Sequence, residues 1–236
     1  MTSAKRVGRI IGMLMLVHLA TGLIVPYVLL LPLQAGFLQT AAGMSAQVRL
    51  SVLLLFVGGA VSVAISVAAW PVVRERSYRL GLWLLALSVV NFTLQILENS
   101  HWLSMLSVSQ AYAEAGAADA ELFQSLGIVV RSAWKWAHYS HILVVVGWLF
   151  VLYNLLLRGE LVPRALASIG LVATMLHVTG ITLPVFLGYR MPFPELFGMP
   201  LGLINLALAL CLMVKGLKEP HGTLRAEAQR TGLSGA

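Results

Sequence analysis

The chain has 236 residues, of which 59% are hydrophobic and 11% are charged, and its formal net charge is +7. Soluble domains are typically about 45–50% apolar and about 25% charged. The composition therefore excludes a soluble domain or a disordered chain and predicts an integral membrane protein. The single cysteine, Cys211, excludes an internal disulfide and any CxxC metal or redox motif.

Six apolar stretches predict membrane-spanning helices, since such a helix needs about 20 mostly apolar residues. The first stretch is longer than the apolar region of a signal peptide, about 7–15 residues, so we expect the chain to retain it. We predict an all-α membrane protein, a single six-helix transmembrane bundle over residues 1–218, followed by a mobile polar tail at 219–236. The predicted spans are 9–31, 50–71, 80–102, 137–157, 165–187 and 198–215.

The basic residues indicate how these spans are oriented. With the N-terminus in the cytoplasm, 12 of the 16 Lys and Arg residues fall on the cytoplasmic side, which agrees with the positive-inside rule. The four on the outer side are Arg49, Arg131, Lys135 and Arg190. Because six spans return the chain to the side where it began, we expect both termini in the cytoplasm. The net charge is then explained by topology and by the lipid bilayer, and no nucleic acid is expected as a partner.

The longest predicted loop runs from Ser107 to Trp136 on the outer side. Within it Leu122, Leu126 and Val130 recur at helical spacing. This pattern predicts a short amphipathic helix that lies on the outer leaflet or caps the bundle.

Prolines and small residues within the spans predict helix shape and packing. We expect Pro26 and Pro184 to bend the first and fifth helices. Ala60, Ala64 and Ala68 form a stripe of small residues at every fourth position, which allows close helix packing within the bundle. The same stripe leaves a homodimer open as an alternative.

Polar residues inside the spans are the candidates for function, because ionisable groups in lipid are costly and seldom without a role. In the third span Asn91, Gln95 and Glu98 share one helix face. A rise of about 1.5 Å per residue places Glu98 near the outer edge of the hydrocarbon layer. The candidate ligand-binding residues from all spans are Asn91, Gln95, Glu98, Arg131, His138, His141, His177 and His18.

One interpretation of these residues is a metal or haem site. Glu98 and His101 form an E-x-x-H pattern, and His138 and His141 form an H-x-x-H pattern. Residues three apart share a helix face, and helical bundles use this spacing to bring carboxylate and imidazole ligands to a metal. Zinc or iron accepts these ligands, and two histidines could hold a haem. This interpretation predicts a metal- or haem-dependent membrane enzyme.

Two other interpretations need no metal. The polar residues could line an outer-half cavity for a small or lipid-like ligand, or a proton pathway in which Arg131 or Lys135 holds Glu98. Alternatively, they could only hydrogen-bond between helices and so hold the bundle together. The sequence contains no P-loop, no nucleophile elbow and no dinucleotide fingerprint.

Two stretches resemble a known family. These are the N-terminal segment from Arg6 to Val17 and the segment from Tyr153 to Gly170, in which Leu161, Pro163 and Arg164 follow a short basic turn. They are similar to the bacterial DUF4386 family, integral membrane proteins of unassigned function, and the similarity extends over about residues 5–218. The resemblance implies a multi-pass protein of the bacterial cytoplasmic (inner) membrane and carries over no catalytic residue.

The sequence thus favours a multi-pass membrane protein that binds a small or lipid-like ligand in an outer-half polar cavity, as a sensor, carrier or accessory subunit. The alternative is the metal- or haem-dependent enzyme. The two differ in what the histidine nitrogens face: a ligand cavity, or a common metal ion.

Overall fold

The computed structural model describes residues 4–30, 36–115, 119–190 and 194–218, and this part of the chain is helical with no strand. The predicted tail at 219–236 lies outside the described residues. Two helices continue into a π-helical turn at the end of the bundle away from the N-terminus, which we call the outer end: α1 into Val25–Leu29 and α7 into Thr182–Phe186. The helices are α1 (Ala4–Ile24), α3 (Phe37–Thr40), α4 (Ser45–Arg76), α5 (Tyr78–Ala115), α6 (Ala120–Arg158), α7 (Arg164–Ile181), a 3-10 turn (Pro194–Phe197) and α8 (Met199–Lys215).

Five helices are long and apolar enough to cross a membrane, namely α1 with its π turn and α4 to α7. Each of the six predicted spans falls on a helix, and the all-α, multi-pass membrane class is confirmed. The last predicted span corresponds to α8, a shorter apolar helix of 17 residues.

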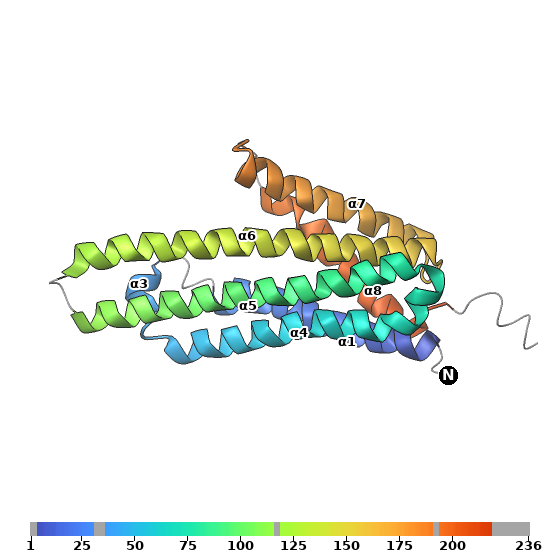
Figure 1. Cartoon of the computed structure of the whole chain (residues 1–236), viewed down its shortest axis with the longest axis horizontal. Helices are drawn as coiled ribbons and strands as arrows, with labels where there is room; N and C mark the ends of the chain where they lie inside the picture. Colours follow the sequence, from blue (N-terminus) through green and yellow to red (C-terminus); the bar gives the residue numbers. More distant parts are fainter. Residues whose placement is uncertain (1–3, 31–35, 116–118, 191–193, 219–236) are drawn as a thin grey trace, which may run out of the picture.

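The five long helices and α8 pack in chain order. α1 packs against α4, α4 against α5, α5 against α6, α6 against α7, and α7 against α8, which returns to α1 (Figure 1). The side chain of Trp148 on α6 is fully buried in this bundle. Figure 1 also shows that α5 and α6 extend as a hairpin well beyond the other helices, at the end away from the N-terminus.

The prediction of a separate amphipathic helix within residues 107–136 is wrong. Instead, α5 continues to Ala115 and α6 begins at Ala120. The apolar positions at Leu122, Leu126 and Val130 are in phase with those of the following span. They therefore belong to the same helix, α6, which has 39 residues. The rings of Tyr112 and Phe123 meet across the hairpin at 5.9 Å.

A second, outer hydrophobic core supports this hairpin. It is separate from the main core around Trp148 and includes Trp102 and Met105 of α5 and Phe37 of α3. Ser109 fastens α3 to α5, because its hydroxyl donates to the carbonyl of Leu38 at 2.9 Å and accepts from the backbone N–H of Ala42 at 2.9 Å. The outer half of the bundle is therefore a packed structure.

Both predicted helix-bending prolines lie in the π turns, Pro26 in Val25–Leu29 and Pro184 in Thr182–Phe186. A proline removes a backbone N–H and disturbs the α-helical ladder, and π turns are a usual site of such a disturbance. The chain closes each turn with a wider bond, from the N–H of Leu30 to Val25 at 2.9 Å and from that of Leu187 to Thr182 at 3.2 Å.

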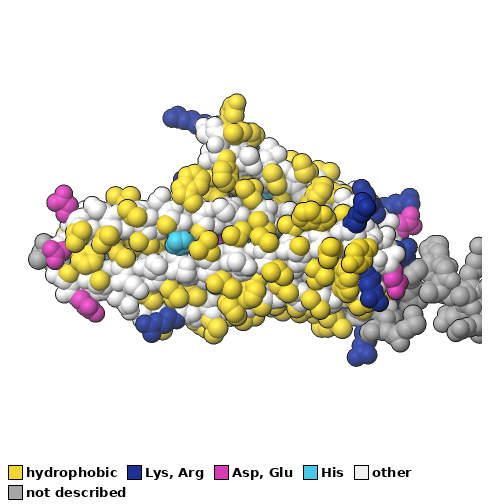
Figure 2. Space-filling model, viewed as in Figure 1, with side chains coloured by type: hydrophobic (Ala, Val, Ile, Leu, Met, Phe, Trp, Pro, Cys, Tyr) yellow, Lys and Arg dark blue, Asp and Glu magenta, His cyan; other side chains and the backbone are white. Residues whose placement is uncertain are grey.

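Charged side chains lie mainly at the two ends of the long axis. On the face shown in Figure 2, basic side chains gather mainly at the end that holds the N-terminus, and acidic side chains lie both there and at the tip of the hairpin. The alanine stripe on α4 lies toward the surface, with Ala64 exposed and Ala60 and Ala68 half-buried. The small residues that α4 turns inward are Gly58, Gly59, Ser62 and Ser66.

A glycine allows α7 to approach α6 closely. A Cβ atom on Gly170 would lie 2.2 Å from the ring of Tyr153, which is fully buried and cannot move aside.

We expect Gly170→Ala to lower the free energy of unfolding by about 1–3 kcal/mol through overpacking, measured by thermal unfolding in detergent. Gly147→Ala is the matched control, because no atom lies within 4 Å of its Cβ position. Equal effects of the two substitutions would contradict this packing.

Candidate functional site

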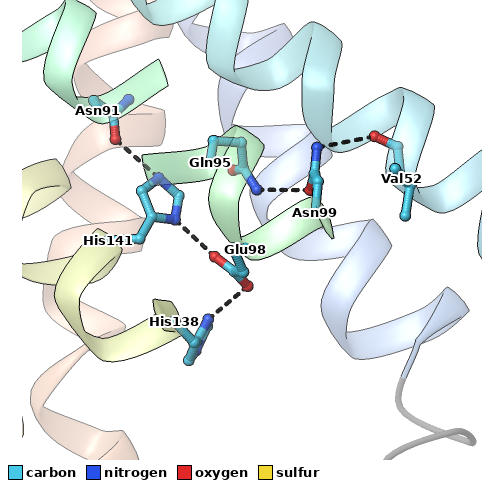
Figure 3. Close-up of polar contacts among 7 residues, drawn as sticks. All are labelled: Val52, Asn91, Gln95, Glu98, Asn99, His138 and His141. Atoms are coloured by element: carbon cyan, nitrogen blue, oxygen red, sulfur yellow. Dashed lines mark hydrogen bonds and ion pairs between the residues drawn. The ribbon is translucent and has the colours of Figure 1, made fainter. Parts of the chain in front are cut away.

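A buried carboxylate joins two histidines in the outer half of the bundle. One carboxylate oxygen of Glu98, on α5, lies 2.9 Å from Nδ1 of His138, and the other lies 2.8 Å from Nδ1 of His141 (Figure 3). The two histidines stand one turn apart on α6, so both face α5. The side chain of Glu98 is 7% exposed, that of His141 11% and that of His138 31%. His138 is therefore the most accessible member of what we call the His–Glu–His cluster: Glu98, His138 and His141.

Aromatic rings cover the outer side of the cluster. The indole of Trp134 stacks on the ring of His138, with centroids 5.3 Å apart and planes inclined by 19°. On its other side the same indole meets Trp102 at 4.9 Å. Because Trp102 belongs to the outer core, the orientation of His138 is tied to the packing of the hairpin.

A chain of hydrogen bonds leads inward from His141. Its Nε2 lies 2.9 Å from Oδ1 of Asn91, and Nδ2 of Asn91 donates to the hydroxyl of Ser62 at 2.9 Å. The hydroxyl of Ser62 in turn donates to the backbone carbonyl of Gly59 at 2.7 Å. The chain thus ends on a group that can only accept.

This end fixes the direction of every bond before it. A hydroxyl has one hydrogen, which Ser62 gives to Gly59, so Ser62 must accept from the amide of Asn91. The oxygen of Asn91 then faces His141 and must accept, which places a hydrogen on Nε2 of His141. Nδ1 of His141 faces Glu98, and Nε2 of the same ring already carries a hydrogen.

Two proton arrangements satisfy the bond between His141 and Glu98. Either the proton lies on Nδ1, which pairs an imidazolium with a carboxylate, or it lies on the oxygen of Glu98 and both groups are neutral. Both arrangements have the same net charge. With His138 donating from Nδ1 to the second carboxylate oxygen, the whole cluster is neutral. A further proton then has its place on Nε2 of His138, for which the described residues supply no hydrogen-bond partner.

A separate pair of amides connects α5 to α4. Gln95 donates to Oδ1 of Asn99 at 3.1 Å, and Nδ2 of Asn99 donates to the backbone carbonyl of Val52 at 3.2 Å (Figure 3). Gln95, predicted to share a cavity with the histidines, thus bonds along its own helix. Asn99 was not among the predicted residues, although its position four residues after Gln95 was a usable signal.

Deeper in the bundle the polar groups pair around Trp148. Its indole N–H donates to the hydroxyl of Ser66 at 2.9 Å, and its ring meets that of His18 edge-on at 5.6 Å. Nδ1 of His18 lies 3.0 Å from the carbonyl oxygen of Gly58. His18 therefore links α1 to α4 without a hydrogen bond to the His–Glu–His cluster.

The remaining predicted residues lie apart from the cluster. His177 is on α7, and its Nδ1 is buried without a hydrogen-bond partner in the described structure. Arg131 is exposed on α6. His101, one turn from Glu98 on α5, is half-buried and makes no hydrogen bond with the described residues.

The expectation that Arg131 or Lys135 holds Glu98 is wrong, because the two histidines occupy both carboxylate oxygens. Lys135 instead places its ammonium 5.6 Å from the ring centre of Trp136. Both basic residues precede the histidines on α6 toward the outer end, where they remain exposed.

The proposed metal ligands are arranged as hydrogen-bond partners. Both histidines direct Nδ1 at a carboxylate oxygen at hydrogen-bonding distance. Among the described residues, no group of three or more His, Cys, Asp or Glu side chains is placed to hold a metal ion.

The fold and its apolar helices define a multi-pass membrane protein with a polar cluster buried between two helices. A family model described as a domain of unknown function, DUF4386, matches residues 10–216, and the chain belongs to this family. No curated protein and no solved structure matches the chain.

The cluster predicts a graded response to substitution of Glu98. Glu98→Ala leaves both histidines without their partner and should lower the free energy of unfolding by about 3 kcal/mol or more. Glu98→Gln keeps the shape of the side chain. Its oxygen can still accept a hydrogen bond from one histidine and its amide nitrogen can donate one to the other, so a smaller loss of about 1–2 kcal/mol is expected. Thermal unfolding in detergent measures both.

Glu114, exposed near the end of the same helix, provides the matched controls Glu114→Ala and Glu114→Gln, which should have little effect. If Glu98→Ala were as mild as Glu114→Ala, the cluster would not stabilise the α5–α6 pair.

Proposed function

We propose that this DUF4386 protein is a sensor or accessory subunit of the bacterial cytoplasmic membrane that binds its ligand from the outer side at the His–Glu–His cluster. The smallest ligand the cluster can take is a proton. The observation that carries the proposal is that one buried carboxylate is shared between a buried histidine and a half-exposed one.

Proton uptake follows from the bonding pattern. In its neutral form the cluster has filled every hydrogen-bond position that faces inward, so a further proton adds at Nε2 of His138. The cluster then carries one net positive charge in a region where charges are poorly solvated. Such a charge favours local rearrangement of the α5–α6 contact.

The extent of the polar chain favours a sensor over a carrier. From His138 the polar contacts lead inward to Asn91 and Ser62, and a neighbouring set ends at Trp148. Further inward, the described core is mainly apolar, with side chains such as Leu152, Leu155 and Leu212. Its buried polar groups bond locally: Ser88 and Thr174 to carbonyls of their own helices, and Tyr153 to Asn205 at 2.7 Å. A group that enters from the outer side thus finds a binding position and no continuous polar path across.

The proposal includes an orientation. We place both termini in the cytoplasm and let α8 cross as the sixth span, because its 17 residues extend about 26 Å as a helix. Hydrocarbon layers are about 30 Å thick, and spans of about 17 residues occur. A homodimer through Ala60, Ala64 and Ala68 is compatible with this arrangement, since the stripe is not fully buried within one chain.

The stacking of Trp134 on His138 provides a direct readout of protonation. An imidazolium quenches an adjacent indole, so protonation of His138 should lower the tryptophan fluorescence of the purified protein when the pH is lowered. We expect His138→Gln to remove at least half of this change, while His101→Gln, on the same level of the bundle but outside the cluster, retains it. If His138→Gln titrates like the wild type, the cluster does not take up the proton.

The orientation has its own test. A green fluorescent protein fused after residue 236 should fluoresce, because this reporter folds in the cytoplasm. Alkaline phosphatase inserted between α5 and α6, at residues 116–118, should be active, because it folds outside. The reverse pattern would refute the orientation and with it the entry of ligands at His138 from the outer side.

A further inference from the structure

We infer that a groove between α4 and α5 binds one acyl chain of an anionic phospholipid, with Arg49 at its headgroup. The groove lies in the outer half of the bundle and encloses about 590 Å³, within the range of about 300–1,000 Å³ typical of ligand sites. This inference goes beyond the proposed function, which concerns the contact of α5 with α6. The groove is lined by Arg49, Val52, Leu53, Phe56, Ile96, Asn99, Ser100 and Leu103.

The walls of the groove suit a hydrocarbon chain. Leu53, Phe56 and Ile96 are each exposed by 44% to 58% on the outside of the bundle. The ring of Phe56 meets that of Phe92 edge-on at 5.0 Å, at the end of the groove nearer the membrane centre. From Arg49 to Phe56 the helix rises about 10 Å, so the groove follows the outer part of one leaflet.

The uncharged polar side chains that line the groove are already bonded. Asn99 uses its amide nitrogen on the carbonyl of Val52 and its oxygen on Gln95. Ser100 donates its hydroxyl to the carbonyl of Leu97 at 2.7 Å. Because these donors are used within the protein, the interior of the groove favours an apolar occupant.

Arg49 supplies the charge that selects a headgroup. It is exposed at the outer end of the groove, three residues before Val52, and no acidic side chain of the described structure pairs with it. Since Val52 bonds to Asn99, the neighbour of Glu98, Arg49 lies near the outer edge of the hydrocarbon layer. A guanidinium at that depth pairs well with a lipid phosphate.

The test compares lipids with identical acyl chains on the purified full-length protein, by native mass spectrometry. Phosphatidylglycerol should bind about fivefold more tightly than phosphatidylcholine, the preference expected from one basic residue at a membrane surface. Arg49→Gln should remove this preference. Ser100→Trp, which fills the groove from an exposed position, should remove the tight site for both lipids.

Two control variants and one control ligand complete the experiment. Arg131→Gln makes the same change of charge outside the groove, and Thr93→Trp adds the same bulk at an exposed position of α5 that does not line it. Both should bind lipid like the wild type. Glycerol 3-phosphate, which has the anionic headgroup chemistry without chains, should not bind.

Three results would each overturn the inference: no preference for phosphatidylglycerol in the wild type, the same preference in Arg49→Gln, or binding of glycerol 3-phosphate as tight as that of the lipid. Equal lipid binding by Ser100→Trp and Thr93→Trp would also overturn it. If Ser100→Trp does not fold, Arg49→Gln decides alone. None of these outcomes depends on the pH response of His138.

Discussion

A carboxylate between two membrane helices must find partners within the protein, because lipid offers none. Glu98 meets this requirement with one histidine on each oxygen, and both histidines come from α6. This double contact fixes how α5 and α6 are rotated and shifted against each other. The stacking of Trp134 on His138, the bond from His141 to Asn91 and the outer core around Trp102 all depend on that register.

The same contact makes the cluster asymmetric. On the inner side, the carbonyl of Gly59 determines the donors and acceptors as far as Nε2 of His141. On the outer side, Nε2 of His138 has no hydrogen-bond partner among the described residues that would determine whether it carries a hydrogen. In the proposed function, the proton adds at this accessible end while the inner bonds keep their direction. The same polar residues also hold α5 and α6 together.

Much of this could be predicted from the sequence, because apolar length and the spacing of polar residues determine where helices run and which faces they present. Asn91 and Glu98 share a face of α5, and His138 and His141 a face of α6, as their spacing indicates. Spacing could not show which faces meet, so Arg131, His101 and His177 were grouped with residues they do not contact. The continuous hairpin was missed because polar residues around Glu114 and Asp119 resemble a loop, while tertiary packing extends both helices.

The length of the α5–α6 hairpin has a mechanical consequence. Glu98 lies 17 residues before the end of α5 at Ala115, a distance of about 25 Å along the helix. The outer core and the hydrogen bonds of Ser109 tie the hairpin beyond the cluster to α3, so a rearrangement at Glu98 would move α3 together with it. A change of about 10° in the direction of α5 at Glu98 would displace the end of the helix by about 4 Å, as follows from the helical rise. If the proposed proton uptake causes such a change, one proton at His138 would produce a movement of several ångströms at the end of the hairpin.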